Sequence, residues 1–220
     1  MEKHEKNTSP RRRLKPQWFL LLLIPALVIS VLLLTGSTLA QPAAAHDTGN
    51  EPAPSKDGRS IELINEFDPP SNLQPGVSFP QTVGATNTGT IPGFVRLLVF
   101  PAIFIDYPSG RKLLPAQIGK EVLLDIDTAN WMLGEDGYYY YLDRLMPGQT
   151  TPPLCTTITL ADASVLTPEY YNAKVNFEIK GEFVNCQEWS YRDAWWGKNA
   201  APPSTGNLGH IENTLGGLVK

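Results

Sequence analysis

The chain has 220 residues, with 18 Lys and Arg against 22 Asp and Glu, and a formal net charge of −4. This length suggests a single domain. The acidic balance gives no basis for nucleic-acid binding, which depends on the neutralisation of phosphates by Lys and Arg.

The N-terminal segment predicts export. The basic residues Arg11–Arg13 precede an uncharged apolar run from Trp18 to about Ala40, and an Ala-rich site follows. This order is typical of a secretory signal peptide, so we place the candidate cleavage between Ala45 and His46. The run also reaches the ~20 residues that span a bilayer, so a retained membrane segment over residues 1–45 stays open. Either way, the protein is expected to be secreted or held at the cell surface, with no other membrane contact.

The residues after the signal predict a flexible leader and then strands. Residues 46–59 are rich in Gly, Pro, Asn and Ser and show no periodicity. The alternation around Ile61 predicts the first strand, and the second, Val77–Ala85, contains Pro80, which favours an edge or a bulge. The apolar run Phe94–Phe100 predicts a central strand.

Arg96 lies inside that apolar run. A buried charge without a partner costs several kcal/mol, so we expect Arg96 to face outward or to meet a carboxylate.

The middle of the chain predicts antiparallel pairing. Glu135-Asp136-Gly137 and Pro147-Gly148 are turn signals, and they bracket the aromatic strand Tyr138–Leu142. Asp125 and Asp127, with Asp136, invite a calcium hypothesis, but they lack the spacing of a calcium loop. We favour ordinary loop acids.

The last predicted strands are Leu154–Leu160 and Val175–Ile179, which alternate with a period of two. No stretch of ten residues after the signal shows convincing helical periodicity. We therefore expect an all-β fold, an antiparallel β-sandwich of jelly-roll type over residues 60–190. An N-terminal signal helix and a flexible C-terminal tail over residues 191–220 complete the prediction.

Two features of this region admit alternatives. Cys155 and Cys186 are the two cysteines, and an even count in an exported chain suggests a structural disulfide, with two buried thiols as the alternative. Four aromatic residues are crowded near the C-terminus. They form either an interaction patch or, as we favour, a cap on the core: Trp189, Tyr191, Trp195 and Trp196.

The sequence argues against an enzyme. The histidines His4, His46 and His210 lie in the signal segment or the expected flexible ends, where none can be held beside a nucleophile. No His-Glu-x-x-His motif is present, so no catalytic, cofactor-binding or metal residue can be assigned.

Several motifs in the same order resemble a known family. Asp136–Tyr141 reads DGYYYY, a Leu-x-Pro-Gly pattern follows between Leu145 and Leu154, and Asn87–Arg96 reads N-T-G-x-x-x-x-F-V-R. These motifs resemble the Gram-positive exported proteins with a SipW-type signal peptide. That group holds the BsaA-like biofilm pilins and is related to TasA and camelysin. The resemblance covers roughly residues 60–185, and its motif residues are Asn87, Thr88, Gly89, Phe94, Val95, Arg96, Asp136, Gly137, Tyr138, Tyr139, Tyr140, Tyr141, Pro147 and Gly148.

The resemblance implies a secreted structural subunit of a surface or biofilm-matrix fibre. Such a subunit would be processed by a SipW-type signal peptidase, would self-associate and would contact cell-wall or matrix components. In related fibres an N-terminal segment completes the sheet of the next subunit, which makes His46–Ile64 a candidate donor, or else a plain disordered terminus. Camelysin is described as a metalloprotease, but this chain lacks the ligands. The alternative function is a monomeric secreted module that binds wall glycan or protein through Tyr138–Tyr141 or Trp189–Trp196.

Overall fold

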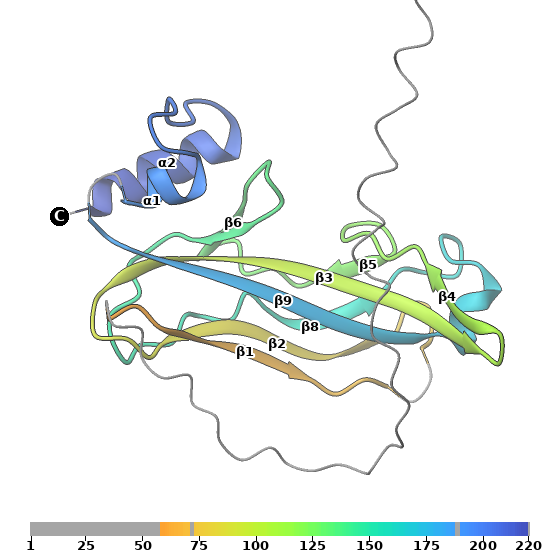
Figure 1. Ribbon diagram of the computed structural model, residues 1–220. Helices are drawn as coiled ribbons and strands as arrows, with labels where there is room; N and C mark the ends of the chain where they lie inside the picture. The colour runs from red at the N-terminus through yellow and green to blue at the C-terminus, as the bar shows by residue number, and fades with distance from the viewer. Residues whose placement is uncertain (1–57, 71–72, 188–189, 220) are drawn as a thin grey trace, which may run out of the picture. The chain divides into compact units, whose positions relative to one another are not determined.

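The computed structural model describes residues 58–70, 73–187 and 190–219 (Figure 1). The signal segment, the cleavage candidates Ala45 and His46, nearly all of the leader, and Trp189 lie outside these residues. Across the described ranges, no helix is both long and apolar enough to cross a membrane.

The first sheet contains the strand nearest the N-terminus at one edge. Its order is β1-β2-β8-β5, and every neighbouring pair is antiparallel. The strands are β1 (Ile61–Phe67), β2 (Ser78–Asn87), β8 (Cys155–Leu160) and β5 (Val122–Leu124). The register of β2 against β8 shifts between Pro80 and Val83, which confirms the bulge expected from the proline.

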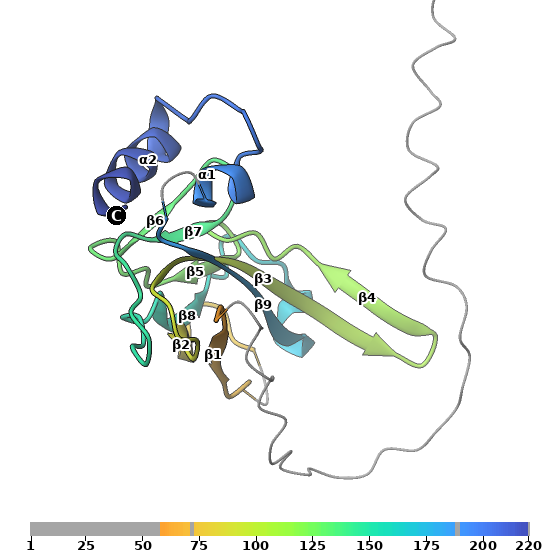
Figure 2. The same ribbon diagram turned by 60° about the vertical axis from the view of Figure 1, so that its left-hand side comes forward.

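The second sheet is built around β3. Its strands are β3 (Gly93–Tyr107), β9 (Lys174–Asn185), β7 (Tyr139–Tyr141), β6 (Trp131–Leu133) and β4 (Gly110–Leu114). β9 pairs with β3 from Gly93 to Phe104 along one side. Along the other side, β7 pairs with Arg96 and Leu97, whereas β4 pairs only from Ile103 onward (Figure 2). The prediction of a central strand at Phe94–Phe100 is confirmed.

Apolar side chains from both sheets form one core cluster. Val83 and Ile158 come from the first sheet, and Val95, Leu97 and Ile103 come from the second. Because successive side chains of a strand point to opposite faces, Phe94 and Arg96 lie on the face of β3 turned away from this core. The predominantly β, antiparallel fold is thus confirmed, whereas the jelly-roll type of sandwich stays a prediction.

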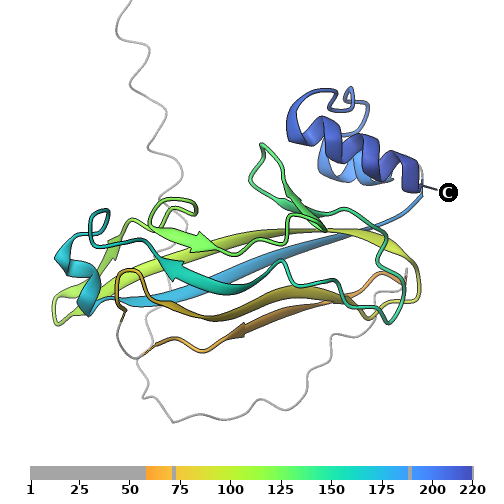
Figure 3. The same cartoon turned by 180° about the vertical axis from the view of Figure 1, so that it is seen from behind.

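The prediction of a flexible C-terminal tail over residues 191–220 is wrong. α1 (Ser190–Trp195) and α2 (Gly206–Leu218) form there, and a 3₁₀ turn, η1 (Pro168–Asn172), precedes β9. Ile211 and Leu215 of α2 are fully buried in a second cluster with residues of the second sheet. Figure 3 shows α2, in dark blue, on the outer side of that sheet. The apolar residues of α2 do recur at helical spacing, but four of its thirteen residues are Gly, which disfavours helix and hides the pattern.

Candidate functional site

The motif residue Arg96 lies at the centre of a polar cluster on the second sheet. The strand register places Tyr140 of β7 on one side of Arg96 and Glu182 of β9 on the other. Directly opposite residues share a face, so the three side chains stand in a row across three strands. Arg96 is only 7% exposed in this position.

Hydrogen bonds and ion pairs satisfy the Arg96 guanidinium. Nη2 lies 2.6 Å from Glu182 Oε2, and Nη1 lies 3.2 Å from Asp136 Oδ2. Nη1 also donates to the Tyr140 hydroxyl at 2.9 Å, and that hydroxyl donates to Asp136 Oδ2 at 2.6 Å. The expectation that Arg96 meets a carboxylate is confirmed twice over.

Aromatic rings enclose the same cation. The centre of the guanidinium lies 3.9 Å from the centroid of the Tyr138 ring and 5.1 Å from the Trp195 ring. The Tyr138 hydroxyl donates to Glu182 Oε1 at 3.0 Å, and Lys180 Nζ lies 2.8 Å from the same oxygen. The cluster therefore connects the sheet with α1.

The shifted pKa values of Tyr140 and Glu182 determine the charge states of these two groups in the cluster. Burial raises the pKa of Tyr140, so its hydroxyl remains a neutral donor. Burial alone would raise the pKa of Glu182, but hydrogen bonds from Lys180 and Arg96 outweigh it and hold the pKa below its usual value. These two groups thus keep their ordinary charge states near neutral pH. The arrangement suits a structural link better than general acid–base chemistry.

The turn between β6 and β7 supports both the cluster and α2. Glu135 accepts the backbone N–H groups of Asn207 and Leu208 at 2.7 and 2.9 Å, so it caps the N-terminus of α2. These backbone bonds lower the pKa of Glu135. The next residue, Asp136, binds Arg96, and Gly137 takes φ 86°, which favours glycine.

The C-terminal aromatic residues pack on the sheet. Tyr191 is 1% exposed and meets the Phe94 ring edge-on at 5.4 Å between centroids. Trp195 meets the Tyr140 ring at 5.4 Å, and Trp196 meets Tyr191 at 5.5 Å. We favoured a cap on the core, and these residues do cover apolar side chains of the sheet. They do so in a second cluster, however, and not over the main core.

The Asn87-Thr88-Gly89 and Pro147-Gly148 motifs meet around the buried side chain of Asn87. The side chain of Asn87, which is fully buried, donates to the carbonyl groups of Ile91 and Leu145, each at 2.9 Å, and accepts the N–H of Gly89. The N–H of Gly148 donates to the Asn87 carbonyl at 2.8 Å. The Asn87-Thr88-Gly89 and Pro147-Gly148 motifs are therefore joined through one asparagine, and their role here is structural.

The predicted disulfide is wrong. Cys155 belongs to β8 in the main core and Cys186 follows β9 in the second cluster, and the two sulfurs are not joined. β8 and β9 lie in different sheets. Burial raises the pKa of Cys155 to about 12, so its thiol is poorly reactive at neutral pH.

The loop acids have partners of their own. Asp125 accepts hydrogen bonds from the backbone N–H groups of Thr156 and Thr157 and from the Thr156 hydroxyl. Asp127 accepts the side-chain amide of Asn130 at 2.7 Å. In the ranges that the structure describes, no three His, Cys, Asp or Glu residues are grouped so as to hold a metal ion.

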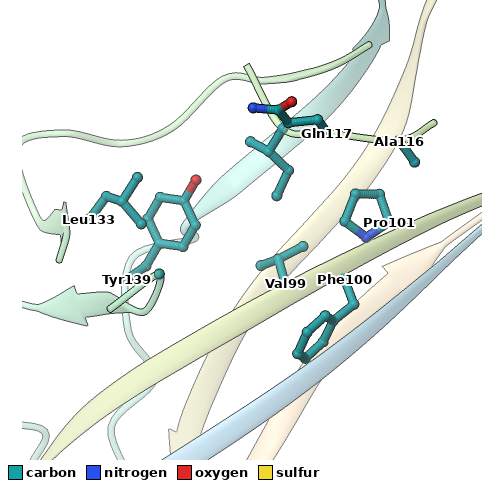
Figure 4. A pocket seen from close by; sticks show the side chains of 9 residues that line it. Val99, Phe100, Pro101, Ala116, Gln117, Leu133 and Tyr139 are labelled. Carbon is teal, nitrogen blue, oxygen red and sulfur yellow. The ribbon is translucent and has the colours of Figure 1, made fainter. Parts of the chain in front are cut away.

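A hollow of about 410 Å³ lies beside β3, where neither β7 nor β4 pairs with it (Figure 4). Val99, Pro101, Ala116, Ile118, Leu133 and Tyr139 are among its lining residues. None of the described residues that line it carries a charge. The sequence analysis missed this hollow, because it arises from two short strands that pair with different halves of β3.

No protein-family model matches the chain, and no curated protein or solved structure matches it significantly. The resemblance to the exported SipW-type proteins therefore rests on the sequence motifs.

Proposed function

We propose that the chain is an exported structural subunit of a surface or biofilm-matrix fibre, and that it self-associates through sheet edges. The motif order supports membership of the SipW-type group, and two antiparallel sheets that share one core are compatible with a jelly-roll sandwich. The proposal assigns no catalytic step and no cofactor.

The outer edge of β1, which no described strand pairs with, carries this proposal. The Ser60 carbonyl accepts the N–H groups of Thr88 and Gly89, so the backbone at this position faces β2. The N–H and C=O groups of successive strand residues alternate in direction, so those of Ile61 and Leu63 face away from β2. β1 ends its sheet, which leaves these groups as a template for an incoming strand.

The donor in this proposal is the N-terminal segment of a second copy. The segment His46–Ile64 was our candidate, and its last four residues already pair with β2 of the same chain. Residues 46–57, which lie outside the described part, then remain as the donor. The N-terminal signal would be removed by a SipW-type signal peptidase before assembly.

The alternative module with an exposed aromatic platform is less well supported. Tyr139, Tyr140 and Tyr191 are each at most 5% exposed, so these rings offer no face to a glycan.

Electron microscopy of the mature chain, residues 46–220, tests the proposal beside a variant that starts at Gly58. Starting at Gly58 keeps the carbonyl groups of Gly58 and Ser60 that hold the turn after β2. We expect fibres from the longer chain and none from the shorter one, with equal melting temperatures showing that the fold is intact. Absence of fibres from both, or fibres from both, would overturn assembly through the N-terminal segment.

A further inference from the structure

The second sheet contains a short gap beside β3, between Leu97 and Ile103, where no described strand pairs with that side of its backbone. Gly93 exchanges both backbone hydrogen bonds with Leu145, so its N–H and C=O face the side of β7. β3 pairs with β9 without a register shift, so every second residue after Gly93 faces the same way. The N–H and C=O of Val99 and the C=O of Pro101 therefore face the gap between β7 and β4.

Pro101 fits this gap for a physical reason. Proline has no N–H and is confined to strand positions whose N–H would face no partner. At position 101 that direction is the gap, so β3 loses no hydrogen bond to β9. The gap therefore offers one donor, from Val99, and two acceptors.

The hollow adds one further polar group to the gap. Tyr139 is 5% exposed, and Figure 4 shows its hydroxyl pointing toward the space between Leu133 and Gln117. No hydrogen bond within the described ranges uses this hydroxyl. Burial raises the pKa of Tyr139, which keeps the hydroxyl protonated as a donor. An extended peptide without charged side chains matches these donors, acceptors and apolar walls.

The same chain presents an exposed, uncharged segment in the loop between α1 and α2. Residues 199–205 read Asn-Ala-Ala-Pro-Pro-Ser-Thr, carry no charge, and are exposed apart from the half-buried Pro203. Within the described part, no backbone hydrogen bond uses Ala201–Ser204. Figures 1 and 3 show this loop at the outer end of the helices, away from the sheets. Proline-rich extended segments commonly dock in grooves with aromatic walls.

We propose that the hollow beside Val99 binds the 199–205 loop of a second copy of this chain. The inference rests on the proposed self-association and adds a contact that does not involve the N-terminal segment. Loop and hollow are different surfaces, so the contact is heterologous, and repeated head-to-tail it extends a chain of subunits instead of closing a dimer. Its small area places it among weak contacts, below about 1,200 Å².

Sedimentation of the Gly58-start protein at about 1 mM tests the contact, because weak association is populated only at such concentrations. Ala116→Glu places a charge in the hollow and Ala201→Glu places one in the loop. We expect each variant alone to lose the concentration-dependent association, and an equimolar mixture to form dimers and nothing longer. The matched control is Val165→Glu, which changes an apolar side chain, 50% exposed, outside both surfaces and should associate like the parent.

The variant Pro101→Ala tests directly whether the bound segment forms hydrogen bonds with the backbone of β3. The variant adds an N–H that faces the gap, so we expect at least a twofold stronger association and slower exchange of the Val99 amide at high concentration. Association that is unchanged in both charge variants, or in Pro101→Ala, would overturn the proposal. Fibre formation by the mature chain is measured separately, so fibres from the mature chain without any association of the unmutated Gly58-start protein at about 1 mM would refute this inference alone. Loss of fibres with the hollow contact retained refutes only the N-terminal assembly.

Discussion

Replacing Arg96 by Met is the sharpest test of the polar cluster. The change removes a cation that is 7% exposed and leaves the Glu182 and Asp136 carboxylates without it. Breaking a buried pair by removing one partner costs about 3–5 kcal/mol. The two carboxylate side chains are 26% and 28% exposed, so water replaces part of the loss. We therefore expect Arg96→Met to lower the free energy of unfolding by about 3 kcal/mol, at the lower end of that range.

Arg111→Met provides a matched control for this experiment. Arg111 also pairs with a carboxylate, at 2.8 Å from Asp106, and also stacks on an aromatic ring, but its side chain is 55% exposed. Exposed pairs contribute about 0–1 kcal/mol, so this variant should unfold in urea almost like the parent.

Urea and thermal unfolding measure both variants. A loss of about 3 kcal/mol corresponds to a drop in melting temperature of about 6–12 °C for a domain of this size. In Arg96→Met with Glu182→Gln, part of the lost stability should return, because one of the two carboxylates that lost the Arg96 cation is gone. Equal losses of unfolding free energy in Arg96→Met and Arg111→Met would refute the conclusion that the Arg96 ion pairs stabilise the fold because they are buried.

Further outcomes follow from other contacts. The pKa of Glu182 is lower in the folded state than its unfolded value of about 4.3, so the charged carboxylate stabilises the fold at neutral pH. In an acid titration, the free energy of unfolding should therefore decrease as the pH falls from about 4.3 through the lower folded-state pKa, and it should decrease less in Glu182→Gln. Gly181→Ala should cost about 1–3 kcal/mol by urea unfolding, because its Cβ would meet the Leu63 side chain of β1; a neutral effect would contradict that packing. Native Cys155 should resist a thiol reagent at pH 8 and react after unfolding, and a reducing agent should leave the melting temperature unchanged. Leu215→Ala should cost about 2–5 kcal/mol and shift the Trp fluorescence, and an unshifted spectrum would argue against the second cluster.

Local patterns predicted the strands well where one face is buried and the other is not. The alternation of Leu154–Leu160 corresponds closely to β8, and that of Val175–Ile179 lies inside β9. The energetic cost of a buried charge predicted a carboxylate for Arg96. It could not say which one, because Asp136 and Glu182 lie 40 and 86 residues away in sequence.

The two errors have a common physical origin in long-range arrangement. The disulfide required β8 and β9 to be neighbours, but strands that follow each other in sequence can belong to different sheets, as these do. α2 was missed because its stability comes from burial of Ile211 and Leu215 and from a cap that lies 72 residues upstream. Neither contribution is visible in the local sequence of the helix.

The cap that Glu135 places on α2 sets an order of events in folding. A helix of thirteen residues with four Gly does not form alone, since each Gly costs about 1 kcal/mol and short helices are marginal in water. The turn that carries Glu135 and the sheet face that receives Ile211 must therefore exist first. α2 therefore docks after this turn and this sheet face have formed, and until it docks, the apolar side chains that it covers in the second cluster stay open to solvent and to other unfinished chains.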